Sequence, residues 1–348
     1  MARPSSWLYV WVLLAATVGG LLFTPLARRF ATRLGVVDEP AGHKTHLEAV
    51  SLLGGLGIYA GAFAAAWTLA GGARNELKGF FLAGLVILVF GVQDDITPMD
   101  PWVKLAAQVS VGLVLVGFGV QVRLTDVGWL DVALSVAWVV AVVNAFNFQD
   151  NMNGLAAGLA AVASGGLFVL AVTEQQYLVA VLSAGVAGGA LGFLPSNYPR
   201  ARVFMGDAGS MFLGFVLAFL GIRLRFLDRA QSTTFLIPVL LLGVPLFDAA
   251  LVTVSRLRRG ISVAQGGADH TSHRLVHLGL HARDAVAALW GVQLLLCLGA
   301  IAIARLGRAA DWTVIGLAAA LALAALFWLE REPATTHLPR GLNRDEAA

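Results

Sequence analysis

The sequence predicts an all-α integral membrane protein, a polytopic bundle of about 10–11 transmembrane helices. Of its 348 residues, 58% are hydrophobic and only 13% are charged, whereas an ordinary soluble domain has about 25% charged residues. The mean hydropathy is +0.78, and the apolar residues fall into blocks separated by short polar segments. The chain lacks the charge needed to cover a water-facing surface, so we expect the lipid bilayer around it.

Eleven apolar blocks are candidate membrane spans, because a helix crosses the bilayer core with ~20 predominantly apolar residues. The block at 79–92 is the shortest and also suits a tilted or half-buried helix. The block at 7–26 has no small-residue cleavage site and further spans follow it, so we expect a retained helix rather than a signal peptide. The blocks cover 7–26, 52–70, 79–92, 103–120, 130–143, 155–173, 177–195, 210–225, 234–254, 285–304 and 312–329.

The positive charges predict an orientation. With eleven spans, alternate connections share one side, and the set that includes the C-terminal tail holds most of the 24 Lys and Arg residues. The positive-inside rule then places the N-terminus outside and the C-terminus in the cytosol, although Arg223, Arg225 and Arg229 lie on the opposite side. We expect one polytopic domain over 1–331 with cytosolic active-site loops, and a polar, disordered tail over 332–348.

The charge balance and the cysteine content exclude other classes of protein. A net charge of +3 and a pI near 9.3 are accounted for by basic residues beside membrane helices, so we expect no nucleic-acid partner. Cys297 is the single cysteine and lies within an apolar block. A disulfide within the chain and a cysteine-based metal site are therefore excluded.

Polar residues gather in five clusters, and all five fall in or beside the loops assigned to the cytosol. A structural scaffold gives no reason for this sorting, whereas an active site on one side of the membrane does. The clusters are His43-Lys44-Thr45-His46, Asp94-Asp95, Asn144-x-x-Asn147-x-x-Asp150, Asn197 with Phe204-Met205-Gly206-Asp207, and Asp269-His270-Thr271-Ser272-His273-Arg274.

Asp94 and Asp95 follow a run of apolar residues at the end of a predicted span. Two adjacent carboxylates repel each other and are costly to desolvate, unless a divalent cation or a cationic partner lies between them. Mg²⁺ prefers carboxylate and phosphate oxygens. The alternative is a solvated loop that carries two acids. Lys104 and Gln108, one turn apart on the next helix, are predicted to face the same place.

Asn144, Asn147 and Asp150 recur every three residues, which places them on one helical face at the end of an apolar span. An interhelical hydrogen-bond seam is the alternative interpretation. Gly206 and Asp207 precede a helix expected near Ser210, whose N-terminus favours phosphate if a metal ion neutralises the carboxylate. The alternative there is a cap, with Asp207 as the N-cap residue.

Asp248 lies inside an apolar block, where an ionisable residue indicates a functional site or a structural pair with a neighbouring helix. His270, His273 and His277 share one face if their segment is helical. With Arg274, this cluster suits a diphosphate better than a metal ion. A solvated basic loop is the alternative.

These clusters, in this order, resemble the polyprenyl-phosphate N-acetylhexosamine-1-phosphate transferases, over roughly residues 35–281. Two positions depart from the family pattern: Asn153 stands where many members have Asp, and Ser272 stands where aminosugar-specific members often have His. The segments that carry the resemblance are Asp38-x-Pro40 with Lys44-x-His46 and Gly54-Gly55, Asp94-Asp95 with Lys104 and Gln108, Asn144 to Leu155, Asn197 to Ser210, Pro245-x-x-Asp248, and His270 to Leu275.

The resemblance implies an Mg²⁺-dependent enzyme, with Mn²⁺ as an alternative ion, that transfers a sugar 1-phosphate from a UDP-sugar to undecaprenyl phosphate. UMP leaves, and the lipid-linked diphospho-sugar serves cell-envelope polysaccharide synthesis. The implied catalytic residues are Asp94, Asp95 and Asp207, of which Asp207 and Asp95 hold the metal ion. The implied substrate-binding residues are Lys44, His46, Lys104, Asn147, Asp150, Asn153, Asn197, Phe204, Asp248, His270, His273 and Arg274.

Among these residues, the resemblance implies that Phe204 stacks on uracil, that Asn197 and Asp150 bind the nucleoside, and that Lys44 and the residues from His270 to Arg274 hold phosphates. It also implies a multi-pass protein of the bacterial cytoplasmic membrane and a homodimer. The alternatives are a secondary transporter, which predicts repeats and polar residues at the bilayer midplane, and a membrane scaffold that uses intramembrane acids. The clusters lie at helix ends and no repeat is found, so the transferase is favoured.

Overall fold

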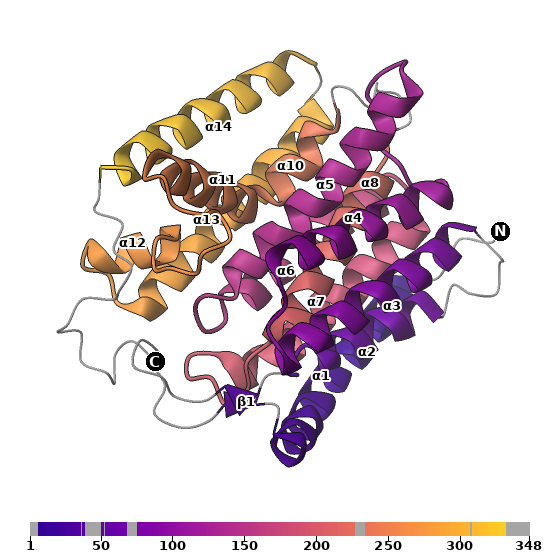
Figure 1. The fold of residues 1–348 in the computed structure, drawn as a ribbon. Helices are drawn as coiled ribbons and strands as arrows, with labels where there is room; N and C mark the ends of the chain where they lie inside the picture. The colour runs from indigo at the N-terminus through magenta and orange to yellow at the C-terminus, as the bar shows by residue number, and fades with distance from the viewer. Residues whose placement is uncertain are drawn as a thin grey trace.

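The computed structural model confirms an all-α polytopic bundle (Figure 1). It describes residues 6–35, 37–38, 50–51, 53–67, 75–226, 234–306 and 308–331. The helices are α1 (Ser6–Leu34), α2 (Leu56–Trp67), α3 (Asn75–Ile96), α4 (Pro101–Gly117), α5 (Gly128–Gln149), α6 (Leu155–Thr173), α7 (Tyr177–Asn197), α8 (Gly206–Arg223), α10 (Leu236–Leu241), α11 (Gly243–Arg258), α12 (Thr271–His277), α13 (Ala282–Leu306) and α14 (Arg308–Leu329).

Within these described residues, seven helices are long and apolar enough to cross a membrane, namely α1, α3, α5, α6, α7, α8 and α13. The apolar parts of α4 and α14 are shorter, at Pro101–Gly117 and Ile315–Leu329. The predicted spans therefore correspond to apolar helices, but not all of them have full spanning length. Which face of the bundle is cytosolic stays a prediction.

The span expected at 234–254 is wrong as a single helix, because the chain breaks between α10 and α11 at Leu242. The side chain of Gln293 on α13 fills the break. Its amide donates to the carbonyl of Leu241 at 2.9 Å, and its carbonyl accepts from the amide of Val244 at 3.1 Å. A polar side chain from a neighbouring helix thus satisfies backbone groups that lipid cannot.

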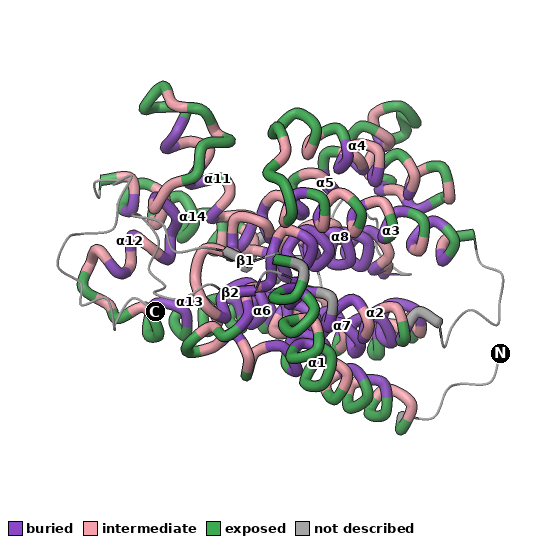
Figure 2. Tube along the Cα trace, turned by 60° about the horizontal axis from the view of Figure 1, so that its bottom comes forward, coloured by how far each residue is buried: buried purple, intermediate pink, exposed green. Residues whose placement is uncertain are grey.

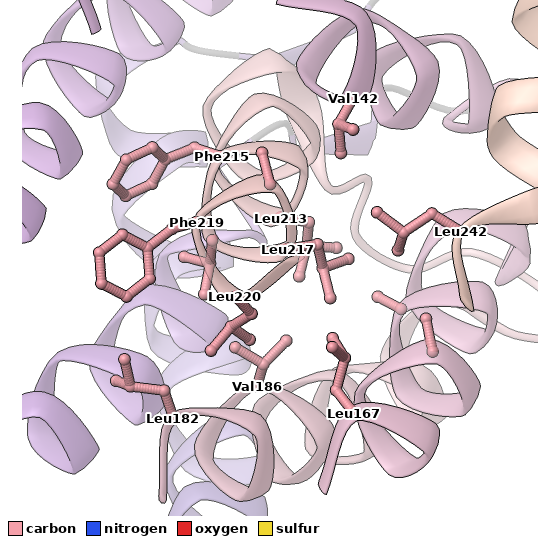
Figure 3. Packing of buried hydrophobic residues seen from close by; sticks show 14 of the residues in the cluster. Val142, Leu167, Leu182, Val186, Leu213, Phe215, Leu217, Phe219, Leu220 and Leu242 are labelled. Atoms are coloured by element: carbon pink, nitrogen blue, oxygen red, sulfur yellow. The ribbon is translucent and has the colours of Figure 1, made fainter. Parts of the chain in front are cut away.

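Helix α8 forms the centre of the bundle. It is apolar on every face, as expected of a helix surrounded by other helices, and it packs against α3, α5, α6 and α7. Figure 3 shows its side chains meeting those of its neighbours in a continuous apolar core. The residues labelled there are Val142, Leu167, Leu182, Val186, Leu213, Phe215, Leu217, Phe219, Leu220 and Leu242.

Helices α1 and α7 approach each other at the level of the backbone. A Cβ atom on Gly188 would lie 2.4 Å from the carbonyl oxygen of Leu13, and one on Gly192 would lie 2.3 Å from that of Thr17. Small residues allow membrane helices such close packing. On its other side α1 exposes large apolar side chains such as Trp7, Trp11 and Phe30, which suits contact with lipid. Figure 2 shows α1 exposed along much of its length.

Helices α3 and α8 run antiparallel, and this arrangement positions the site. The start of α3 meets the end of α8 through an ion pair of Glu76 with Arg223 at 3.0 Å. The end of α3 meets the start of α8, where a Cβ atom on Gly91 would lie 2.5 Å from the Cα of Ala208. The acids at the end of α3 therefore lie beside Asp207 in the first turn of α8.

Two short strands complete the fold at this end of the bundle. Strand β1 (Val37–Asp38) pairs antiparallel with β2 (Val50–Ser51), and Ser51 also forms a parallel bridge with Val203. The amide of Phe204 donates to the carbonyl of Ser51 at 2.9 Å. The loop before α8 is thereby joined to the segment that follows α1.

Candidate active site

Asp95 caps the N-terminus of α8 from another helix. Its Oδ1 accepts from the amide of Asp207 at 2.7 Å and its Oδ2 from the amide of Ala208 at 3.1 Å. The helix begins at Gly206, which has a φ of +72°. The interpretation of Asp207 as the N-cap residue is therefore wrong, since the capping carboxylate belongs to Asp95. Asp207 is left free to direct its own carboxylate elsewhere.

Lys104 lies between two carboxylates. Its ammonium group forms an ion pair with Asp94 and a second one with Asp207 at 2.8 Å. Asp94 also accepts from the backbone amide of Met99 at 2.7 Å. The start of α4 is fixed by Asp100, which accepts from the amide of Trp102 at 2.8 Å. The predicted convergence of Lys104 with the acidic pair is present, and it includes Asp207.

Amide side chains of α5 complete this cluster. Asn147 donates to Oδ1 of Asp207 at 2.6 Å and to Oγ of Ser210 at 3.0 Å. One turn earlier, Asn144 and Gln108 exchange hydrogen bonds between α5 and α4. The face predicted from the three-residue spacing therefore meets both α4 and α8. Both carboxylate oxygens of Asp207 have a neutral or cationic donor.

Asp150 ends α5 beside the same turn of α8. Burial, and next the charges of Asp207 and Asp95, raise the pKa of this carboxyl well above its ordinary value, while a hydrogen bond from the Gly206 amide opposes the rise. Asp94, Asp95, Asp150 and Asp207 thus gather around one helix N-terminus. Such a concentration of acids favours a cationic ligand.

The loops that flank the cluster are held by side-chain amides. Buried Asn197 accepts from the amide of Gly154 at 2.6 Å and donates to the carbonyl of Val203 at 2.9 Å. Asn153 donates to the carbonyl of Pro199 at 3.3 Å, and Phe204 is half-buried. In the structure the side chains of Asn197 and Asn153 form hydrogen bonds with backbone groups of these loops. Their contacts with a nucleotide stay predictions.

A second cluster joins α5 to α11 and α12. Nδ1 of His270 lies 2.8 Å from Oδ2 of Asp248, whose Oδ1 accepts from the amide of Thr271 at 2.5 Å. Ser272 donates to Asn151 at 2.7 Å. Asp248 on α11 therefore pairs with His270 in the loop before α12. At Ser272, where the family pattern has a third histidine, the side chain donates to Asn151 just after α5.

Charged groups around α12 are strongly perturbed. Burial, and next the charge of His270, lower the pKa of His273 to about 4, so this ring is neutral at pH 7. Burial alone would raise the pKa of Asp269, but hydrogen bonds and charge from Arg256, with Arg259, lower it to about 2. Arg256 contacts Asp269 with two nitrogens, at 3.0 and 2.7 Å.

Arg274 was predicted to hold a phosphate, but its contacts in the structure are with protein. The guanidinium is only 1% exposed. It donates to the carbonyl of Asp269, to Ser255, to Glu330 and to the carbonyl of Leu329. Lys44 and His46 lie outside the described residues, so their role stays a prediction.

The acidic cluster fits the requirements of Mg²⁺. No set of three or more His, Cys, Asp or Glu side chains suited to a metal ion occurs in the described part of the chain, but Mg²⁺ usually takes one or two protein carboxylates together with substrate phosphates and water. The absence of a side chain at Gly206 lets the Asp95 carboxylate lie against the start of α8, since a Cβ there would lie 2.6 and 2.8 Å from its two carboxylate oxygens. Asp95 and Asp207 would supply the carboxylate oxygens, and their binding of a metal ion stays a prediction.

Sequence reasoning missed several polar contributors. Ser210 and Asn151 lie inside or beside the polar clusters in the sequence. Their closeness to predicted site residues was the signal that could have identified them. Arg256 and Glu330 carried no such signal, because their partners come from distant segments.

Fold and site together define a membrane-embedded enzyme, whose acids, amides and one lysine meet at the ends of several spans. Residues 77–225 match the model of glycosyl transferase family 4, and together with the relatives below this shows that the chain belongs to that family. The predicted resemblance is confirmed. The match includes the acidic cluster and ends before Asp248.

Three relatives illustrate the similarity. A probable undecaprenyl-phosphate N-acetylglucosaminyl 1-phosphate transferase of Bacillus subtilis is 31% identical over 81% of this chain and 81% of its own. A decaprenyl-phosphate N-acetylglucosaminephosphotransferase of Mycobacterium leprae is 32% identical, over 80% and 79%. The undecaprenyl-phosphate alpha-N-acetylglucosaminyl 1-phosphate transferase of Escherichia coli K12 is 27% identical, over 84% and 81%.

Proposed function

We propose that the protein transfers N-acetylglucosamine 1-phosphate from UDP-N-acetylglucosamine to undecaprenyl phosphate in the bacterial cytoplasmic membrane. The product is a lipid-linked diphospho-sugar for cell-envelope polysaccharide synthesis, and UMP is released. The observation that carries this proposal is the meeting of Asp94, Lys104, Asn147 and Asp207 around the N-terminus of α8. The names of the relatives supply the polyprenyl phosphate acceptor and the transferred N-acetylglucosamine phosphate group, and the family resemblance implies the UDP donor.

In the proposed reaction, an oxygen of the lipid phosphate bonds to the β-phosphorus of the nucleotide sugar. The bond from that phosphorus to the bridging oxygen breaks, and the electron pair leaves with UMP. Phosphoryl transfer depends mainly on positioning and on neutralising charge. Lys104 is the cation that contacts the acids, and it would orient the lipid phosphate with Asp94, which takes its proton if that phosphate arrives protonated.

Asp207 and Asp95 are the residues that would hold Mg²⁺ or Mn²⁺, which would neutralise diphosphate charge when bound. Asp95 has a second role in this scheme, because its hydrogen bonds to the first amides of α8 fix the turn that carries Asp207. Asn147 would hold the Asp207 carboxylate in one orientation. A homodimer also remains part of the proposal.

The test uses the purified full-length protein in detergent with undecaprenyl phosphate, Mg²⁺ and a panel of UDP-sugars, and it measures released UMP. UMP release with UDP-N-acetylglucosamine, dependent on the lipid, supports the proposal. A folded protein that releases no UMP with any sugar would refute it. Release with another sugar only would keep the reaction class and reject the sugar.

A further inference from the structure

The end of α14 contacts α12, the short helix that follows His270 and carries His273. Glu330, in the turn directly after α14, lies 3.0 Å from Nη2 of Arg274 on α12. The preceding carbonyl of Leu329 accepts from the same guanidinium. Figure 1 shows α14 at one edge of the bundle, with its C-terminal end on the side of α11 and α12. The end of α14, more than fifty residues later in the chain, thus packs against α12.

Arg274 is fully engaged within the protein. Its Nε donates to the carbonyl of Asp269 at 3.0 Å, and its Nη2 donates to Oγ of Ser255 on α11 at 2.8 Å. A buried guanidinium needs a counter-ion, and removal of that partner leaves an uncompensated charge. Glu330, whose side chain is 10% exposed, supplies the negative charge.

The opposite side of α12 is attached to the candidate active site. His270 at its N-terminus contacts Asp248, and Ser272 donates to Asn151 just after α5. The segment is only seven residues long, and so short a helix is marginal without tertiary contacts. Its position therefore depends on both sets of contacts, those to α5 and α11 and those to the end of α14.

We propose that Arg274 and Glu330 form a latch through which the end of α14 positions α12 for binding of the nucleotide sugar. Arg274 is then a positioning residue that acts through α12, and its guanidinium does not touch the substrate phosphates. The substrate named here rests on the proposed function, but the latch itself does not.

Glu330 offers a matched set of variants, because it has two arginine partners in different surroundings. Arg258 contacts it at 3.5 Å and is 68% exposed, whereas Arg274 is buried. Exposed ion pairs contribute little, so Arg258→Ala serves as the control. Glu330→Gln keeps a carbonyl acceptor for Arg274, and Glu330→Ala removes it.

Hydrogen exchange of the full-length protein in detergent tests the latch without any activity measurement. We expect Glu330→Ala to increase amide exchange in α12 about tenfold while exchange in α8 stays unchanged, since only the local opening becomes easier. Glu330→Gln should show a smaller increase and Arg258→Ala none. Unchanged exchange in α12, or an equal increase in α8, would overturn the proposal.

Kinetics then test the link to substrate. Glu330→Ala should raise the KM for UDP-N-acetylglucosamine about tenfold and leave the KM for undecaprenyl phosphate unchanged, because displaced binding groups weaken one substrate selectively. Equal effects on both substrates would refute this link. An inactive wild-type protein would refute the proposed function, whereas the exchange measurement would still decide the latch.

Discussion

The carboxylate of Asp95 accepts a hydrogen bond from the backbone amide of Asp207 at 2.7 Å, so one catalytic candidate fixes the backbone of another. The two acids come from different helices and have different duties. Asp95 holds the first turn of α8, and Asp207 directs its side chain to Lys104 and Asn147. Variants of the two residues should therefore fail in different ways.

Asp207→Asn should lower the rate of UMP release by at least about 100-fold with little loss of stability, because it removes charge but no backbone contact. Asp95→Ala should lose the same activity and also about 1–2 kcal/mol of stability, as for a lost helix cap. Activity assays and thermal unfolding in detergent measure both. Exposed Asp126→Asn is the control, and equal stability losses in the two acid variants would contradict the division of roles.

Gly206→Ala should destabilise the start of α8 for two reasons. The φ of +72° disfavours a side chain, and the new Cβ would lie 2.6 Å from Oδ2 of Asp95. Gly119→Ala is a matched control, because Gly119 has a φ of +82° and a Cβ there would meet no other atom within 4 Å. Gly119→Ala should cost about 1 kcal/mol and Gly206→Ala more. Equal shifts in unfolding temperature for the two variants would show that the Asp95 side chain moves aside without a cost in stability.

Lys104→Met should leave Asp94 and Asp207 facing each other without their shared cation. We expect at least a 100-fold loss of kcat/KM for UMP release, of the order found when a charge-stabilising group is removed. Lys104→Arg should retain part of the activity. Full activity in Lys104→Met would exclude the ammonium group from the reaction.

Removal of divalent cations should stop UMP release without unfolding the protein, because hydrogen bonds and Lys104 hold the acids in place. Treatment with EDTA followed by Mg²⁺ or Mn²⁺ tests this, with circular dichroism to follow the helices. UMP release at the full rate in EDTA would contradict a metal-dependent reaction.

Stability should decrease as the pH falls from about 6.5 to 4, because His273 has a pKa of about 4 in the folded protein and 6.5 as its ordinary value. In that window the unfolded chain binds a proton that the folded chain excludes. His273→Gln should remove up to about 3 kcal/mol of this pH dependence, and exposed His281→Gln should not. Thermal unfolding at a series of pH values provides the measurement.

The charge of Asp269 should affect the stability of the protein at lower pH than that of His273. Its pKa of about 2 in the folded protein lies below the ordinary value of 3.8, so its stabilising effect is complete above pH 3.8 and is lost as the pH falls toward 2. Asp269→Asn should therefore destabilise the protein at pH 7 but cause little change near pH 2. A similar loss at both values would contradict the role of its charge.

Local spacing predicted much of the candidate site. The three-residue repeat of Asn144, Asn147 and Asp150 and the one-turn spacing of Lys104 and Gln108 identify helix faces, since helical periodicity is a property of short segments. The all-α membrane class followed from apolar blocks in the same way. The contacts between side chains on different helices could not be predicted in this way, because no local sequence pattern specifies them.

The expectations that the structure contradicts both depend on contacts between different helices. The capping carboxylate of α8 comes from Asp95, 112 residues away. The span at 234–254 looked continuous because its break is satisfied by Gln293 from α13, which hydropathy does not register.

The enclosure of α8 has a consequence for the enzyme in different membranes. Its most apolar stretch is 89% buried, against 22% for that of α1, so protein rather than lipid surrounds the helix that carries Asp207. A thinner or thicker bilayer tilts helices that face the acyl chains, and α1 would adapt first. The depth of Asp207 would stay constant, which would keep the phosphate chemistry at one height while the membrane around it changes composition.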